Sequence, residues 1–196
     1  MNPTFSPVSN GFKNASRRLV LAAAVLAGLL SVSGCATPQL ADYAAEKPTL
    51  DMRQYFSGTV DAYGVFTDRS GKVLKRFTVV MKCSWEGAPG QETGVLDENF
   101  SNSDGTKDRR IWTLKRSQDG TYTGTAADVV GVASGEEKGN AFRWGYTLKL
   151  PVDGKIVEVQ FDDWMYLMTD KVMLNKAVMS KYGFRLGEVT LSFVKR

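Results

Sequence analysis

The sequence predicts an all-β domain, an antiparallel up-and-down barrel of the lipocalin kind, with a β-sandwich as the alternative. After Arg53, short runs of aromatic and β-branched residues alternate with turn signals. Within these runs apolar and polar residues alternate with a period of two, which indicates a sheet with one buried face. About eight to ten such strands in one domain are expected to close or to stack, because open sheet edges promote aggregation.

The expected turns follow one another along residues 53–196, which we interpret as a single barrel domain. They fall at 68–71, 86–90, 102–105, 118–120, 135–140 and 152–154, and several contain Asp-Gly, a strong hairpin signal. The glycines at 131, 135 and 139 indicate a flexible connection. Residues 171–182 are ambiguous, because their apolar positions fit one short helix as well as a strand pair.

The alternation assigns most of the large apolar residues to one inner face: Phe77, Met81, Trp85, Trp112, Phe142, Trp144, Tyr146, Phe161 and Met165. In a small barrel such residues usually fill the interior. They could equally line a cavity for an acyl chain, and the periodicity does not distinguish the two.

The N-terminus has the layout of a secretory signal. Arg17 and Arg18 precede the apolar run 19–30, which is followed by small residues and Cys35. This run is shorter than the roughly 20 residues of a transmembrane helix, and residues 32–35, Val-Ser-Gly-Cys, resemble a bacterial lipobox. We therefore expect residues 1–34 to be a lipoprotein signal peptide and Cys35 to be lipidated.

The residues after Cys35 suggest where and how the protein is anchored. Ala36, in place of an aspartate, favours the outer membrane under the sorting rule of enteric bacteria, so we expect the inner leaflet of that membrane, facing the periplasm. Residues 35–52, with two prolines and little periodicity, are interpreted as the lipidated cysteine and a flexible tether.

Composition excludes several classes of function. Removal of residues 1–34 takes away Lys13, Arg17 and Arg18 and no acid, which lowers the formal net charge from +4 to +1 and argues against a nucleic-acid partner. The chain has no histidine, which excludes Ser-His-Asp and Cys-His catalysis and histidine-ligated metals. Cys83 remains without a disulfide partner and is expected to be a small core residue.

The best candidate for a polar site is Asp162-Asp163-Trp164, at the end of an apolar strand. Consecutive strand residues point to opposite faces, so one of the two acids faces inward, as does one of Arg109 and Arg110. These residues could form the polar floor of a ligand cavity, but we favour an ion pair at one barrel end, in which an aspartate contacts an arginine. The segment 102–108 only partly matches a calcium loop and is better explained as a hairpin turn.

Three blocks of sequence resemble a known family. They are L-D-E-N-F-S-N-S-D-G-T-K-D-R-R-I-W at 96–112, A-D-V-V-G-V-A-S-G at 127–135 and F-D-D-W-M-Y-L-M at 161–168. Together they resemble the DUF3833 family of uncharacterised proteobacterial lipoproteins, over nearly all of the chain from Tyr55 onward. The resemblance implies a lipocalin-like barrel and assigns no catalytic residue, because the family has no established activity.

These observations favour binding over catalysis. We expect a lipid-anchored envelope protein whose barrel takes a hydrophobic or amphipathic ligand, such as an acyl chain. An interaction or structural module of an envelope complex, with a filled barrel, is the alternative, and a carboxylate-based enzyme is the third. The expected partners are the membrane, through the N-terminal lipid, and an apolar ligand; no cofactor, metal or catalytic residue is expected.

Overall fold

The computed structural model describes residues 37–152 and 154–196. Residues Gln39–Arg196 form one compact unit that contains all the described helices and strands. The expected signal peptide and Cys35 lie outside the described residues. The strands are β1 (Gly58–Asp68), β2 (Val73–Glu86), β3 (Thr93–Asn102), β4 (Lys107–Arg116), β5 (Thr121–Thr125), β6 (Ala133–Lys138), β7 (Ala141–Val152), β8 (Lys155–Leu167), β9 (Val172–Lys181) and β10 (Phe184–Lys195).

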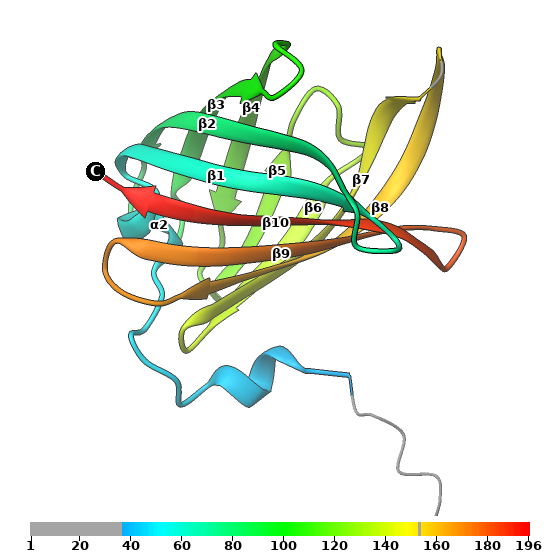
Figure 1. Cartoon of the computed structure of the whole chain (residues 1–196). Coiled ribbons are helices and arrows are strands. Elements are labelled where there is room, and N and C mark those ends of the chain that lie inside the picture. The colour runs from blue at the N-terminus through cyan, green and yellow to red at the C-terminus, as the bar shows by residue number, and fades with distance from the viewer. Residues whose placement is uncertain (1–36, 153) are drawn as a thin grey trace, which may run out of the picture. The chain divides into compact units, whose positions relative to one another are not determined.

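The strands form a closed antiparallel barrel, as the alternation predicts (Figure 1). Each strand pairs with its neighbours in sequence, and β1 closes the sheet against β10 in the register Val60↔Lys195 to Asp68↔Gly187. Closure removes both sheet edges. The up-and-down, lipocalin-like barrel is confirmed, and the β-sandwich alternative is wrong.

Residues 171–182 form no helix; β9 occupies Val172–Lys181. Met173, Ala177 and Met179 alternate along this strand and are buried in the core. Pairing of β9 with both β8 and β10 satisfies its backbone groups, so the barrel selects the strand over the helix.

The expected turn at 135–140 is also largely a strand. β6 covers Ala133–Lys138, and only Gly139 and Asn140 form the turn. Gly135 pairs with Trp144, and a Cβ at Gly135 would lie 2.4 Å from the Trp144 Cβ. Close approach of this tryptophan, rather than flexibility, explains the glycine.

The two barrel ends differ. The hairpins β2–β3, β4–β5, β6–β7 and β8–β9 lie at the end that also holds the short helix α2 (Met52–Tyr55), which we call the closed end. The hairpins β1–β2, β3–β4, β7–β8 and β9–β10 lie at the opposite, open end. Leu50, Met52, Tyr55 and Phe56 are buried in the core at the closed end.

From Leu40 onward the segment before α2 packs against the barrel, whereas we expected a flexible tether over 35–52; Cys35 and Ala36 lie outside the described residues. The 3-10 helix η1 (Leu40–Tyr43) packs against β6 and β7. Tyr43 packs its ring against Trp164 and Tyr166, at centroid distances of 5.7 and 5.3 Å. Aromatic packing therefore holds the chain against the barrel from η1 onward. No helix in the described ranges is long and apolar enough to span a membrane.

Candidate functional site

Arg109 and Asp162 face outward and pair with other residues. The Arg109 guanidinium donates to Asp97 at 2.8 Å, which lowers the pKa of that carboxyl. Arg143 on β7 donates to Asp162 at 2.7 Å, and its guanidinium lies 4.8 Å from the ring of Trp164. Asp162 and Trp164 are thus part of the outer wall.

Arg110 and Asp163 face inward, as one member of each pair was expected to do. No hydrogen bond or ion pair between described residues joins Asp162 or Asp163 with Arg109 or Arg110. The expected direct ion pair is therefore wrong. Each inward residue instead belongs to a set of polar side chains that sequence analysis did not identify.

The first set surrounds Arg110 on β4. Its guanidinium donates twice to Asp128, at 2.7 and 3.0 Å, and lies 3.8 Å from Glu98 on β3. The connection between β5 and β6 holds Asp128 in place, because Lys149 N–H donates to the Asp128 carbonyl at 2.8 Å. Phe100 lies under the guanidinium at 5.7 Å. Asp128 therefore already neutralises the positive charge of Arg110 through this bidentate ion pair.

The second set surrounds Asp163 on β8. Tyr146 on β7 donates its hydroxyl to Asp163 at 3.0 Å, and the amide of Asn175 on β9 also donates to this carboxylate. The indole N–H of Trp144 lies close enough to contribute to lowering the Asp163 pKa, although Nε1 makes no hydrogen bond of normal geometry. Burial outweighs these donors and raises the pKa of Asp163 above its ordinary value.

The two sets form one interior cluster, consisting of Glu98, Arg110, Asp128, Tyr146, Asp163 and Asn175. Burial raises the pKa of Glu98 to about 7; Arg110 opposes this shift, while Asp128 and Asp163 add to it. The cluster therefore holds three carboxyl groups against one guanidinium. It favours a bound proton, a cation or a hydrogen-bond donor over an additional anion.

The interior cluster is not completely sealed from solvent. Arg110 faces inward, yet its side chain is 25% exposed, whereas that of Glu98 is 13% exposed. Five inward-facing apolar residues toward the open end are only half-buried: Phe66, Phe77, Phe100, Val189 and Leu191. Partly exposed apolar residues therefore lie between the open end of the barrel and the interior cluster.

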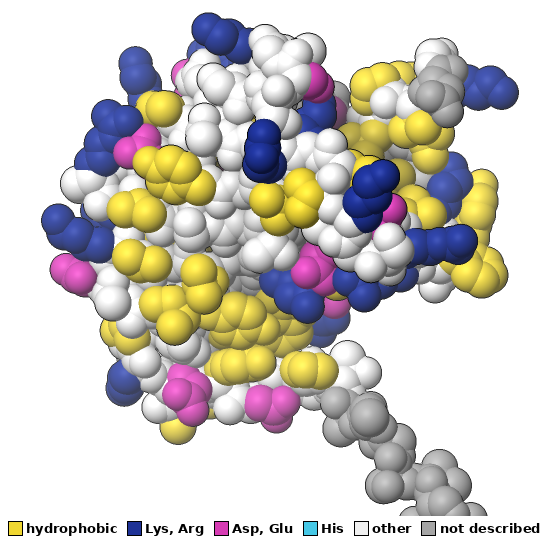
Figure 2. All heavy atoms as spheres, in the orientation of Figure 1, with side chains coloured by type: hydrophobic (Ala, Val, Ile, Leu, Met, Phe, Trp, Pro, Cys, Tyr) yellow, Lys and Arg dark blue, Asp and Glu magenta, His cyan; other side chains and the backbone are white. Residues whose placement is uncertain are grey.

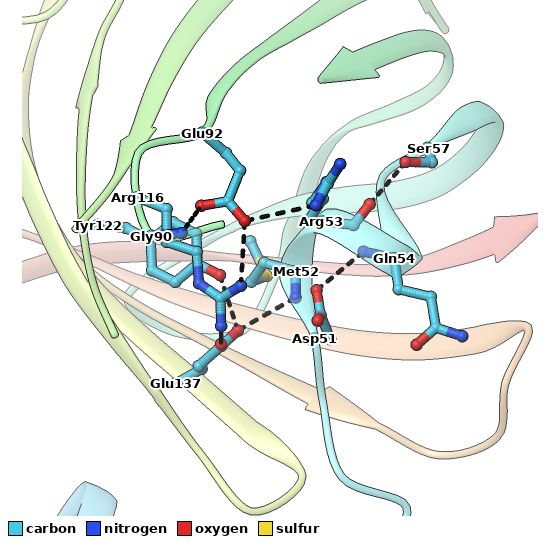
Figure 3. Close-up of polar contacts among 10 residues, drawn as sticks. All are labelled: Asp51, Met52, Arg53, Gln54, Ser57, Gly90, Glu92, Arg116, Tyr122 and Glu137. Carbon is cyan, nitrogen blue, oxygen red and sulfur yellow. Dashed lines mark hydrogen bonds and ion pairs between the residues drawn. The ribbon is translucent and has the colours of Figure 1, made fainter. Parts of the chain in front are cut away.

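A second polar network belongs to the closed end (Figure 3). Glu92, only 1% exposed, accepts from Gly90 N–H at 2.7 Å and lies 3.4 Å from Arg53 and 3.6 Å from Arg116. Glu137 accepts from Met52 N–H, Arg116 and Tyr122 at 3.0–3.1 Å. These carboxylates connect α2 to strands around the barrel, so we interpret the network as structural.

Two shallow depressions lie on the outer wall. One, of about 480 Å³, lies over β1, β2, β9 and β10 and includes Tyr63, Arg76 and Leu174. The other, of about 420 Å³, includes Arg143 and Asp162. Asp162 therefore borders an outer depression rather than the interior.

Two other features of the sequence, Cys83 and the 102–108 segment, have structural roles. Cys83 is buried on the inner face, and burial raises the pKa of its thiol to about 12, as expected for an inert core residue. Asp104 in the 102–108 segment accepts from Thr106 within the hairpin turn and pairs with Lys75 at 2.9 Å. Among the residues that the structure describes, no three or more His, Cys, Asp or Glu side chains are arranged so that they could hold a metal ion.

Comparison with known proteins shows to which family this chain belongs. DUF3833, described as a protein of unknown function, matches residues 29–195. The chain belongs to this family. No curated protein matches it. The DUF3833 barrel is similar to a solved structure, that of the S-type phycobiliprotein lyase CPES from Guillardia theta, with a TM-score of 0.58 and 9% identity over 81% of this chain and 98% of that chain. At this identity the likeness shows the fold alone.

Most of the interior cluster of this DUF3833 barrel was missed by sequence analysis, although its signal was present. On β3 the inward-facing positions are every second residue, and Glu98 is the one between Leu96 and Phe100. On β9 Asn175 likewise takes the inward-facing position between Met173 and Ala177. A polar residue at an inward position was the available signal. Asp128 gave no such signal, because it lies outside the regular strands.

Proposed function

We propose that this protein is an envelope lipoprotein, anchored through Cys35, that binds an amphipathic ligand in the open half of its barrel. The observation that carries the binding proposal is the partial exposure of inward-facing apolar and polar side chains toward the open end. Half-buried Phe77, Phe100 and Leu191 offer apolar contact, and the cluster around Glu98 and Asp163 offers polar contact at greater depth. Ligand sites commonly combine an apolar lining with a few convergent polar groups.

The cluster favours a cationic or neutral, hydrogen-bonding headgroup over a carboxylate. Arg110, the only cation in the interior cluster, is already paired with Asp128, so it is not free to bind a fatty-acid carboxylate. An additional anion would lie among Glu98, Asp128 and Asp163. A headgroup that donates hydrogen bonds would instead satisfy these carboxylates.

Binding can be tested with three fluorescent probes that share one acyl chain and carry an amine, a hydroxyl or a carboxylate headgroup. We expect the amine and hydroxyl probes to bind more tightly than the carboxylate probe at neutral pH. Leu191→Trp should block all three, because its side chain fills the open end from the inner face. The matched control is Thr190→Trp, which places the same indole on the outer face of β10.

Two results would contradict the proposal. Absence of binding for all three probes would do so, as would equal loss of binding in the Leu191 and Thr190 variants. Tighter binding of the carboxylate probe would contradict the headgroup preference alone.

The anchor requires its own test. We expect Cys35→Ser to abolish incorporation of a labelled fatty acid and to block processing of the signal peptide. Equal label in the variant and in the wild type would rule out acylation at Cys35. This outcome would leave the proposal for the barrel unchanged.

A further inference from the structure

We infer that the tips of the β7–β8 and β9–β10 hairpins dock the open end of the barrel onto an anionic membrane surface. This inference does not require the ligand proposed above. It rests on the apolar residues that these tips expose, on the backbone that presents one of them and on the basic residues beside them.

The apolar residues are concentrated at the free ends of the two hairpins. Tyr182 is 85% exposed and Phe184 is 76% exposed on β9–β10, and Ile156 is 67% exposed on β7–β8. Leu186 and Val152 add exposed apolar surface beside them. Figure 2 shows hydrophobic side chains together with lysines or arginines where these hairpins protrude from the barrel. Two projecting tips match shallow insertion into lipid better than they match a flat protein interface.

The backbone at the β9–β10 tip presents an aromatic residue at a conformational cost. Tyr182 has φ 51° and Gly183 has φ 80°, so both central turn residues are left-handed. Asn, Asp or Gly normally occupies such a position, because other side chains are strained there. An aromatic residue at a strained and exposed position supports a role outside the fold itself.

The charge around these tips is complementary to anionic lipid. Lys155 begins β8, and Lys181 and Arg185 flank Tyr182 and Phe184. Arg185 pairs with Glu188, whereas Lys181 lies over the Tyr182 ring at 5.2 Å. Among the described residues, Lys155 and Lys181 form no ion pair that would neutralise them. Aromatic and aliphatic side chains interleaved with lysines are typical of the membrane–water interface.

Cosedimentation with vesicles tests the inference on residues 39–196, the compact unit that contains every described strand. We expect this unit to bind phosphatidylglycerol vesicles and to bind phosphatidylcholine vesicles more weakly. Tyr182→Asn with Phe184→Ser should weaken binding to both by about tenfold or more, because apolar insertion is lost. Lys155→Glu with Lys181→Glu should weaken binding only to phosphatidylglycerol, by about fivefold per lysine removed.

The matched control is Ile111→Ser with Lys115→Glu, which removes exposed apolar and basic side chains from the outer face of β4. We expect this variant to bind like the wild type. Circular dichroism should show the same β-sheet spectrum for all variants, and Asn at position 182 accepts the left-handed backbone.

No vesicle binding by the wild type would overturn the inference, as would equal loss in the β4 control. Failure of the ligand proposal is distinguishable, because the vesicle assay contains no probe. Leu191→Trp, which blocks the barrel, should leave vesicle binding unchanged.

Discussion

Glu98 provides the sharpest test of the interior cluster. Burial raises its pKa from an ordinary 4.5 to about 7, so between these values the folded protein binds the proton more strongly than the unfolded chain. The free energy of unfolding must therefore fall as the pH rises through this window. For these two pKa values, the linkage relation gives a loss on the order of 2–3 kcal/mol between pH 5 and pH 8.

Glu98→Gln removes this titration and keeps nearly the same shape. We expect the variant to gain stability relative to the wild type as the pH rises from 5 to 8, by on the order of 2–3 kcal/mol. The attraction to Arg110, 3.8 Å away, is already contained in the raised pKa of Glu98, so it does not change how this gain varies with pH. Because Asp163 and Glu137 also have raised pKa values, the informative quantity is the difference between variant and wild type at each pH.

Urea unfolding, followed by tryptophan fluorescence from pH 5 to pH 8, measures this difference. Glu136→Gln on β6 is the control, because Glu136 is exposed on the outer wall. A difference between Glu98→Gln and the wild type that does not change with pH would refute the buried, protonated Glu98. An equal pH dependence in the Glu136 variant would refute it as well.

Three further predictions concern the closed end and the core. Glu92→Gln should lower the free energy of unfolding by about 1–2 kcal/mol at neutral pH in urea titrations, because two partly exposed arginines lose a buried anionic partner. Gly64→Ala should destabilise the barrel by about 1–3 kcal/mol, since its Cβ would lie 2.6 Å from the Phe77 ring; Gly145→Ala, where the nearest atom is 3.7 Å away, should have a much smaller effect in the same titrations. Cys83 should react with a thiol reagent in residues 39–196 only after unfolding, and rapid reaction in native buffer would contradict its burial.

The barrel itself follows from local pattern. Alternation along residues such as Phe77, Met81 and Trp85 defines a strand with one buried face, and a pattern of period two requires no knowledge of distant partners. For the same reason, the sequence predicted that one residue of each pair, Arg109–Arg110 and Asp162–Asp163, faces inward. It did not decide which one. In residues 171–182 the pattern was ambiguous, and only pairing on both sides made the segment a strand.

The side-chain partners of these inward residues could not be predicted from local pattern, because they depend on the strand register and on closure of the barrel. Arg110 finds Asp128 from an irregular connection, and Asp163 finds Tyr146 and Asn175 across neighbouring strands, rather than the expected opposite charge. The sequence by itself thus determined the fold class and the inner face, which depend on local periodicity. Only the tertiary structure decided which inward groups meet and which end of the barrel α2 covers, because these depend on contacts between residues far apart in the chain.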